Sequence, residues 1–405
     1  APPLGHTAWQ LRSRSGWGAV ALGFVPLVVW ESFSLWYYGF LFPNTAFAKL
    51  NTGIPQGELV LQGLRYLANS LQADPLTPLT ISAGILVPLI RENRHHAMVG
   101  AGLLLYVLYT VGIGGDFMTG RFLAAPFLGA VVVLVRSGML RSARANALAC
   151  AGALGLGLCS SGPPLLSGAE YGYRAAPRGI NDERATYYQD AGLLRGLLAA
   201  PGTEFPTHGW ATTGRMLKTH GASVGISEGY FTAAAQWDSA VVVAAKAVGY
   251  KGFFAGPRAH IFDAYGLGDP LMARLPTYEV DNWRPGHLGR MVPEGYLETL
   301  VSGQNRIADR DLAAYYDKLC ALTRGGLWDW SRLAEIWRFN AGYYDHLINY
   351  PAYRSPAPVE IAWSEARIRA GDPAAFIALG KEFFKIGRPR EATASLKEAL
   401  RTNPV

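Results

Sequence analysis

The sequence predicts an α-helical polytopic membrane domain followed by a mixed α/β domain that ends in a tetratricopeptide-like helical hairpin. Long apolar runs dominate residues 1–168, whereas residues 169–405 hold most of the acidic residues and the charge patterns of surface helices. Residues 375–404 have the spacing of two packed helices. These observations divide the chain into a membrane domain at 1–168, an α/β domain at 169–357 and a helical tail at 358–405.

Five apolar segments are interpreted as membrane spans, because an apolar helix needs about 20 residues to cross the hydrocarbon core. A sixth segment, 57–73, places leucines at helical spacing opposite polar residues such as Glu58 and Arg65. It is too polar to span and is expected to lie along the membrane surface. The predicted spans lie near residues 16–42, 76–90, 97–113, 122–135 and 145–166.

Basic residues indicate how these spans are oriented. If the five spans alternate, most of the arginines that flank them fall on one side, which the positive-inside rule makes cytoplasmic. The polar segment at 44–49, the surface helix, the loop at 114–121 and the whole of 169–405 are therefore expected on the non-cytoplasmic side. The cytoplasmic residues are Arg12, Arg14, Arg91, Arg94, Arg136, Arg141 and Arg144, against Lys49, Arg65 and Arg121 on the other side.

Two short polar segments interrupt the apolar region on the non-cytoplasmic side. Residues 114–121 read Gly-Gly-Asp-Phe-Met-Thr-Gly-Arg, and residues 42–49 read Phe-Pro-Asn-Thr-Ala-Phe-Ala-Lys. A charge at membrane depth costs about 2.5–3.5 kcal/mol unless protein, water or an anionic group compensates for it. These charges favour an anion-binding site. The alternatives are a solvated turn, a structural ion pair between Asp116 and Arg121, and an interfacial lysine at Lys49.

The α/β domain has less regular patterns. An apolar, β-branched run at 241–247 predicts a buried strand. Residues 206–230 contain glycine and histidine and are expected to be irregular. Helices are expected at 192–200, 271–275, 309–323 and 328–340.

The tail carries a separate pattern. Leu379, Gly380, Gly387, Ala392 and Pro404 have the spacing of a tetratricopeptide hairpin. One such hairpin cannot bury its own apolar face, so it is expected to pack on the preceding helix or to continue into a further repeat.

Composition favours neither a metal site nor nucleic-acid binding. The three cysteines are too scattered for a disulfide framework or a zinc site, and no basic stripe is interleaved with aromatic residues. His260, Asp263 and His287 are metal-ligand types, but their scatter favours solvated or capping roles. Glu31, inside the first span, is interpreted as structural.

Five segments, taken in order, resemble one family. They are residues 37–49, 114–122, 181–184, 266–276 and 284–287. Together they resemble the AftB-like arabinofuranosyltransferases over roughly residues 20–300, and the helical tail lies outside the resemblance.

The resemblance implies a glycosyltransferase of the GT-C type. Such enzymes are polytopic proteins of the bacterial inner membrane with a periplasmic C-terminal domain. They take a sugar from a polyprenyl-phosphate donor, here decaprenyl-phospho-arabinofuranose or a close analogue, and pass it to a glycan or glycoprotein acceptor. Their catalytic aspartates lie in the first periplasmic loop. Because the sequence opens at Ala1 without a start methionine or signal peptide, the general base is expected upstream of it.

The chemistry assigns roles to the polar residues. Lys49 and Arg121 are expected to bind the donor phosphate and to stabilise the charge that develops on it as the bond to the sugar breaks. Asp116 is expected to orient a neighbour or to link to a divalent cation, for which the resemblance leaves room. The remaining candidates for donor or acceptor binding are Tyr38, Asn44, Asn181, Asp182, Glu183 and Arg184.

Two rival functions stay open at this point. A non-catalytic envelope scaffold would use the membrane domain as an anchor and present the α/β domain and the tail to a protein partner. A transporter would need broken helices and polar residues at mid-bilayer, and apart from Glu31 the spans hold few of these. An upstream loop with one or two aspartates would favour the enzyme over the scaffold.

Overall fold

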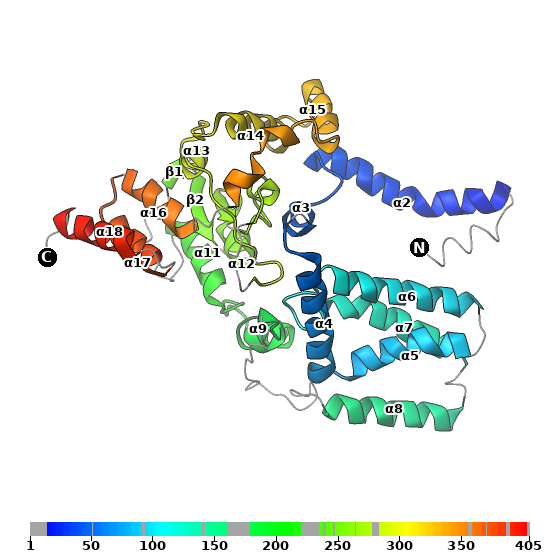
Figure 1. Ribbon diagram of the computed structural model, residues 1–405. Coiled ribbons are helices and arrows are strands. Elements are labelled where there is room, and N and C mark those ends of the chain that lie inside the picture. The colour runs from blue at the N-terminus through cyan, green and yellow to red at the C-terminus, as the bar shows by residue number, and fades with distance from the viewer. Residues whose placement is uncertain are drawn as a thin grey trace. The chain divides into compact units, whose positions relative to one another are not determined.

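The computed structural model divides the chain into two compact units (Figure 1). Unit 1 comprises Ala1–Val29, Ile54–Thr203 and Asn282–Gly286, and unit 2 comprises Trp30–Gly53, Glu204–Asp281 and His287–Val405. The units interleave along the chain, whereas the predicted domains 1–168, 169–357 and 358–405 are consecutive and stay predictions. The described residues are 14–50, 52–90, 94–138, 142–159, 179–220, 235–237, 240–245, 248–263, 265–277, 283–354, 359–369, 371–385 and 389–402.

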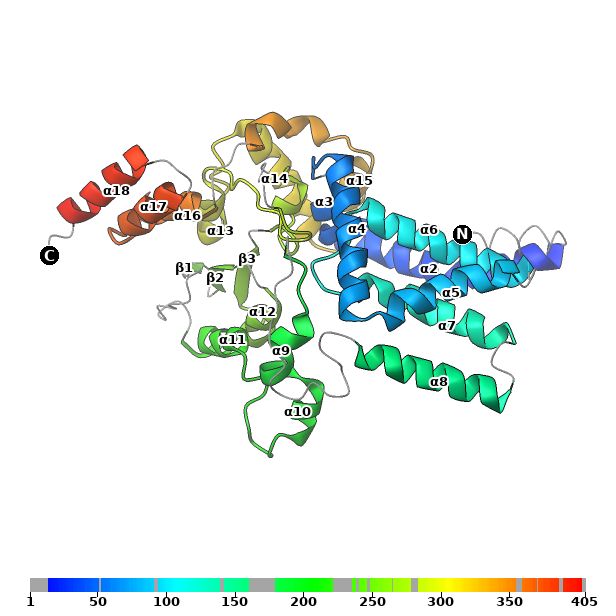
Figure 2. The ribbon, with the colours of Figure 1, turned by 60° about the horizontal axis from the view of Figure 1, so that its bottom comes forward.

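Unit 1 is built from helices. Figures 1 and 2 show α5, α6 and α7 side by side, with α4 across one end. The axes of α4 and α5 differ by 112°, and the bend falls at Asp74, whose carboxylate accepts a 2.6 Å hydrogen bond from the Thr77 hydroxyl. The helices are α4 (Gln56–Ala73), α5 (Leu76–Ile90), α6 (Arg94–Gly112), η1 (Arg121–Leu123), α7 (Ala124–Arg136), α8 (Ala143–Leu158), α9 (Glu183–Ala191) and α10 (Leu193–Leu198), and α2 (Arg14–Tyr38) is divided between the units.

Helices stand at all five positions predicted as spans. Two described segments, Trp17–Tyr38 and His95–Gly112, are long and apolar enough to cross a membrane, or three if the bent pair α4 and α5 forms one span. Helix α2 ends at Tyr38 rather than near residue 42, because Gly39 has a left-handed backbone with φ of +82°. The number and orientation of the spans stay predictions, and residues 160–166 of the fifth lie outside the described residues.

Two glycines let the helices of unit 1 approach closely. A Cβ built on Gly63 of α4 would lie 2.3 Å from the carbonyl oxygen of Val111, and one on Gly84 of α5 would lie 2.7 Å from the Cα of Ala130. Only a residue without a side chain fits at such a contact. The core beside these contacts contains Tyr66, Ile81, Leu103, Leu123, Ala130 and Ile180.

Unit 2 contains a small mixed sheet. Strand β2 confirms the strand predicted at 241–247. It pairs antiparallel with β1 and parallel with β3, where Val242 lies opposite His260, and α12 makes the crossover from β2 to β3. The elements are α11 (Gly209–His220), β1 (Ala235–Trp237), β2 (Ala240–Ala245), α12 (Gly249–Ala255) and β3 (Ala259–Asp263).

The prediction of irregular structure at 206–230 is wrong for residues 209–220, which form α11. The main-chain N–H of Trp210 donates to Nδ1 of His208, which lies one residue before the helix. Ala211 and Leu217 are buried, and Gly214 lies against the carbonyl oxygen of Lys251 in α12. Tertiary packing on α12 therefore outweighs the weak local helical signal.

The core of unit 2 encloses a segment from the start of the chain. The Arg290 side chain, 1% exposed, donates to the carbonyl oxygens of Ala48 at 2.6 Å and Leu275 at 3.1 Å. Arg332 donates to Tyr37 at 2.9 Å and also to Trp36. The elements involved are α3 (Asn44–Leu50), η4 (Met272–Arg274), α13 (Tyr296–Ser302), α14 (Arg310–Thr323), α15 (Trp330–Asn340), η5 (Asp345–Leu347) and η6 (Tyr350–Tyr353).

The tail forms three helices, α16 (Val359–Arg369), α17 (Ala375–Lys385) and α18 (Pro389–Thr402). Ile361 of α16, Leu379 and Phe383 of α17 and Ala392 of α18 form one apolar cluster. The helical pair expected at 375–404 is present and packs on the preceding helix. Its assignment to the tetratricopeptide class stays a prediction.

The close approach of α4 to α6 leads to a stability prediction. Gly63→Ala should destabilise the protein by about 1–3 kcal/mol, because the added methyl group meets the main chain of α6. Gly57→Ala, in the same helix with no atom within 4 Å of its Cβ, is the matched control and should be neutral or slightly stabilising. Thermal unfolding of the detergent-purified protein, followed by tryptophan fluorescence, measures both. Equal midpoints for the two variants would contradict the tight contact.

Candidate functional site

The polar loop between α6 and η1 is held by glycines and by a second segment of unit 1. Gly115 has φ of +66°, and a Cβ there would lie 2.5 Å from Cβ of Tyr66. Asn181 pairs with the loop through its main chain: its N–H donates to Phe117 at 2.7 Å, and its carbonyl oxygen accepts from Thr119 at 3.0 Å. The structure thus brings two of the predicted motifs, 114–122 and 181–184, together.

Within this loop Asp116 and Arg121 form an ion pair through two close contacts, of which the Nη2–Oδ1 contact is a hydrogen bond. Nε of Arg121 lies 2.6 Å from Oδ2 of Asp116, and Nη2 lies 2.7 Å from Oδ1. The carboxylate is 2% exposed, whereas the Arg121 side chain is 41% exposed. The guanidinium also lies 5.3 Å from the ring centres of Phe117 and Phe122. The ion-pair alternative is therefore what the structure shows, and a buried acid fixes the orientation of a half-exposed cation.

A second arginine of unit 1 contacts the same loop. Arg284 stacks over Phe117 at 4.8 Å and donates to the carbonyl oxygen of Gly179 at 2.9 Å and to Glu183 at 3.3 Å. Arg284 was not among the predicted site residues, although it belongs to the 284–287 motif. Its pairing with Glu183, 101 residues away in sequence, is not visible in any local pattern.

The remaining residues of the 181–184 cluster have different environments. Asp182 caps α9, where its carboxylate accepts hydrogen bonds from the N–H groups of Arg184 at 3.0 Å and Ala185 at 3.4 Å. The side chain of Arg184 is exposed. Asp182 therefore has a clear structural role, and its binding role stays a prediction.

The other predicted residues, Tyr38, Asn44 and Lys49, belong to unit 2. Tyr38 is 53% exposed, and it lines a cavity of about 790 Å³ together with Asn44. Lys49 lies in the last turn of α3 and is half-buried. Because Lys49 and Arg121 lie in different units, their joint action on one phosphate stays a prediction.

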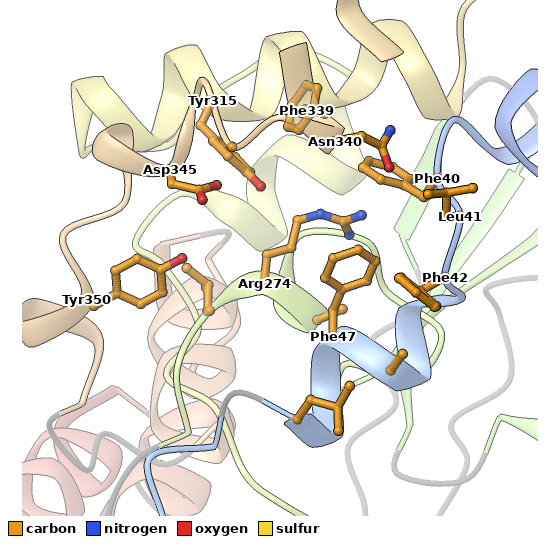
Figure 3. Close-up of a pocket in the computed structure, with 15 residues that line it drawn as sticks. Phe40, Leu41, Phe42, Phe47, Arg274, Tyr315, Phe339, Asn340, Asp345 and Tyr350 are labelled. Carbon is orange, nitrogen blue, oxygen red and sulfur yellow. The ribbon is translucent and has the colours of Figure 1, made fainter. Parts of the chain in front are cut away.

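Unit 2 also holds an arginine that the sequence-based selection missed. Arg274, at the end of η4, is 9% exposed and lies 4.1 Å from the ring centre of Phe40 and 4.5 Å from that of Phe47. Its Nη1 donates to Asn44 at 3.2 Å and to the carbonyl oxygen of Pro270 at 2.6 Å. It projects into a cavity of about 380 Å³ (Figure 3). The signal available was its place in the 266–276 motif.

Asp269 fixes the turn that carries Arg274. Its carboxylate accepts hydrogen bonds from the N–H groups of Leu271 at 3.0 Å and Met272 at 2.9 Å and from the Tyr296 hydroxyl. Burial raises the pKa of Asp269 to about 6, although the hydrogen bonds lower it.

His260, Asp263 and His287, the three residues of metal-ligand type noted in the sequence, make contacts within the fold. His260 lies in β3, and burial lowers its pKa to about 4. Asp263 accepts hydrogen bonds from the N–H groups of Tyr265 at 2.9 Å and Gly268 at 2.7 Å, and the ring of His287 packs on Tyr265. Within the described residues, no group of three or more His, Cys, Asp or Glu side chains is arranged to hold a metal ion.

The apolar helices, two of them long and apolar enough to cross a membrane, are typical of a helical membrane protein. Sequence comparison adds a similarity to one class of enzyme. The chain is similar to the terminal β-(1→2)-arabinofuranosyltransferase of Mycobacterium tuberculosis, with 26% identity over an alignment of 333 residues that covers 68% of this chain and 51% of that protein. The predicted resemblance to AftB-like arabinofuranosyltransferases is confirmed. The chain spans about half the length of that relative. No protein-family profile and no solved structure matches the chain.

The Asp116–Arg121 pair leads to a prediction on stability. Arg121→Leu should cost about 1–3 kcal/mol, because it leaves a buried carboxylate without its cation. The double variant Asp116→Asn/Arg121→Leu should recover part of this loss, because the amide carries no charge. Unfolding midpoints of the wild type, both single variants and the double variant complete the cycle. Strictly additive effects would mean that the two side chains do not interact.

Asp269 leads to a prediction on pH dependence. Its pKa is about 6 in the folded protein against the ordinary 3.8, so the folded state retains a proton that the unfolded state releases. The resulting contribution to stability, about 3 kcal/mol, is complete below pH 4 and is lost as the pH rises through 6. Asp269→Asn should remove this slope from the thermal midpoint between pH 4 and 7. A variant with the same pH profile as the wild type would contradict the assignment.

Proposed function

We propose that this chain is part of a membrane glycosyltransferase that moves arabinofuranose from a polyprenyl-phosphate donor to a glycan or glycoprotein acceptor. The observation that carries the proposal is the similarity to an arabinofuranosyltransferase. The half-exposed arginine held by a buried acid in the loop after α6 supports it. The proposal includes the GT-C type, the bacterial inner membrane and a periplasmic position for the α/β domain.

The proposed chemistry depends on cations near the donor phosphate. When the bond between the sugar and the phosphate oxygen breaks, negative charge grows on the polyprenyl phosphate, and a fixed cation stabilises the transition state more than the ground state. Arg121 is suited to this role because Asp116 orients its guanidinium before the donor binds. Lys49 is proposed as the second cation. A carboxylate must also accept the proton of the acceptor hydroxyl, and we place this base in an earlier loop of the full-length enzyme.

A second candidate function is the envelope scaffold. Trp328 and Trp330, at the start of α15, are both 83% exposed, and Leu400 of α18 is 63% exposed. Exposed aromatic and aliphatic side chains of this kind favour contact with a partner or with lipid. This function requires no transfer reaction, so an activity measurement separates the two candidates.

The first test is transfer from a synthetic polyprenyl-phospho-arabinofuranose by the purified full-length protein. Lys49→Gln and Arg121→Gln should each lower the transfer rate by about ten- to a hundredfold, because each removes a charge-assisted contact to the phosphate. Arg121→Lys should retain more activity than Arg121→Gln, although it loses the bidentate geometry.

The control for this test is Lys397→Gln, which removes an exposed lysine from α18 in the tail. It should leave the rate unchanged. Thermal midpoints of all variants separate loss of folding from loss of catalysis. Neither transfer nor donor binding by the wild type would exclude the enzyme and favour the scaffold, whereas wild-type rates in both charge variants would remove Lys49 and Arg121 from the site.

A further inference from the structure

Arg274 is a buried cation whose hydrogen-bonding capacity is only partly used. Its Nη1 is engaged by Asn44 and by the carbonyl oxygen of Pro270, but its Nη2 has no hydrogen-bond partner among the described residues. The side chain is 9% exposed. Buried polar groups are normally paired, so the unused donor indicates an acceptor that comes from outside this part of the chain.

The surroundings hold the guanidinium in place, and the nearby carboxylates of Asp269 and Asp345 interact with it electrostatically without an ion-pair contact. The rings of Phe40 and Phe47 lie close to it, and its side-chain partner Asn44 is neutral. Within the described residues Arg274 forms no ion pair, in contrast to Arg121. A planar guanidinium fixed in this way and keeping its charge matches the oxygens of a phosphate group.

The lining of the 380 Å³ cavity differs on the two sides of Arg274 (Figure 3). In this view Tyr350 and Asp345 lie on one side of the arginine, and Leu41 and Phe42 lie on the other. Within the part of the chain that the structure describes, the Asp345 carboxylate and the Tyr350 hydroxyl form no hydrogen bond. One side therefore presents polar groups suited to sugar hydroxyls, and the other presents apolar groups.

The apolar side borders a neighbouring cavity of about 790 Å³. The two cavities share Phe40, Leu41 and Phe42. The larger one is lined by Trp30 and Tyr37 from the last turns of α2, a helix apolar enough to cross a membrane, and by Leu322 and Leu327. The apolar path thus leads from Arg274 toward the end of a candidate span within unit 2.

We propose that the Arg274 pocket binds the head of a lipid-linked glycosyl phosphodiester, with the phosphate on Arg274, the sugar beside Asp345 and Tyr350, and the first lipid units along Leu41 and Phe42. The polar residues, the arginine and the apolar residues follow one another in the same order as the sugar, the phosphate and the lipid of such a molecule. The site rests on the proposed function, because it holds the donor class of that reaction. A soluble sugar phosphate shares the phosphate and the sugar and lacks only the lipid.

Equilibrium binding to the detergent-purified full-length protein tests this site with three probes: farnesyl-phospho-arabinofuranose, farnesyl methyl phosphate without the sugar, and arabinofuranose 1-phosphate without the lipid. Arg274→Met retains the apolar stem and should weaken binding of the first probe by about ten- to a hundredfold. Arg274→Lys should lose less. Arg310→Gln, an exposed arginine of α14, is the matched control and should bind as the wild type does.

The sugar side is tested separately, with variants that leave Arg274 in place. Tyr350→Phe should weaken the glycosylated probe by about three- to tenfold and leave farnesyl methyl phosphate unchanged. Asp345→Asn should weaken the glycosylated probe relative to farnesyl methyl phosphate, whose binding should not weaken because a negative charge near Arg274 is removed. These variants also carry the test if Arg274→Met fails to fold. Equal binding by Arg274→Met and the wild type would overturn the phosphate site, and equal loss of both lipid probes in Asp345→Asn would overturn the sugar position. Arabinofuranose 1-phosphate binding as tightly as the lipid probe would overturn the lipid path.

Failure of this site and failure of the proposed function give different results. Arabinofuranose transfer that persists in Arg274→Met overturns the site and leaves the glycosyltransferase. Arg274-dependent binding of the glycosylated lipid, without transfer by the wild type, supports the site and removes the glycosyltransferase.

Discussion

Two buried arginines hold unit 2 together. Arg290 and Arg332 direct their donors at main-chain carbonyl oxygens between Trp36 and Ala48, a segment that is far from them in sequence. Burying a guanidinium is costly unless its donors are paired, and the carbonyl oxygens in the last turn of a helix, such as those of Trp36, Tyr37 and Ala48, also need a donor. Each arginine meets both requirements at once. The ends of α2 and α3 are thereby fixed in the core of unit 2, and the Arg274 pocket is lined by residues of α3, η4 and α15.

Arg290, Arg121 and Arg274 differ in how much of their hydrogen-bonding capacity and exposed surface remains available to a ligand in the folded protein. Arg290 uses its donors on several carbonyl oxygens, so its role is structural. Arg121 is paired with a buried carboxylate but keeps 41% of its side chain exposed. Arg274 is buried like Arg290, yet its Nη2 has no partner within the described residues. The sequence alone does not distinguish these three arginines. The number of donors that each one already uses within the protein separates a structural arginine from one that can bind a ligand.

Sequence patterns predicted what depends on local periodicity. The apolar runs gave the positions of α2, α5, α6, α7 and α8, the amphipathic pattern at 57–73 gave α4, and the β-branched run at 241–247 gave β2. These patterns gave no helix at α3, which occupies one of the two short polar segments. They did not give α11, whose apolar face is short and is stabilised by packing on α12 rather than by its own residues. The bend between α4 and α5 was also out of reach, because the angle depends on how α4 packs across α6 through Gly63.

The candidate site was predictable only where its residues are close in sequence. Asp116 and Arg121 are five residues apart, and their pairing was one of the alternatives the sequence offered. Asn44 and Arg274 are 230 residues apart, and no local pattern indicates that Phe40 and Phe47 enclose the guanidinium. The 266–276 motif showed that this stretch resembles a family. It did not show which of its side chains is buried, retains an unused hydrogen-bond donor and points into a cavity.

The electrostatics of the two cations indicate a division of labour. An ion pair with a buried carboxylate leaves the Asp116–Arg121 loop close to neutral, so this loop offers directed N–H groups more than net charge. Arg274 has a neutral hydrogen-bonding partner and low exposure, so solvent screens its charge weakly, and the nearby carboxylates of Asp269 and Asp345 make no ion-pair contact with it. A phosphodiester carries one negative charge and gains most from a weakly screened cation, whereas sugar hydroxyls need only directed donors and acceptors. Charge therefore favours Arg274 for holding the phosphate of a lipid-linked sugar, and Arg121 would contribute to the proposed donor site mainly through N–H groups that Asp116 orients.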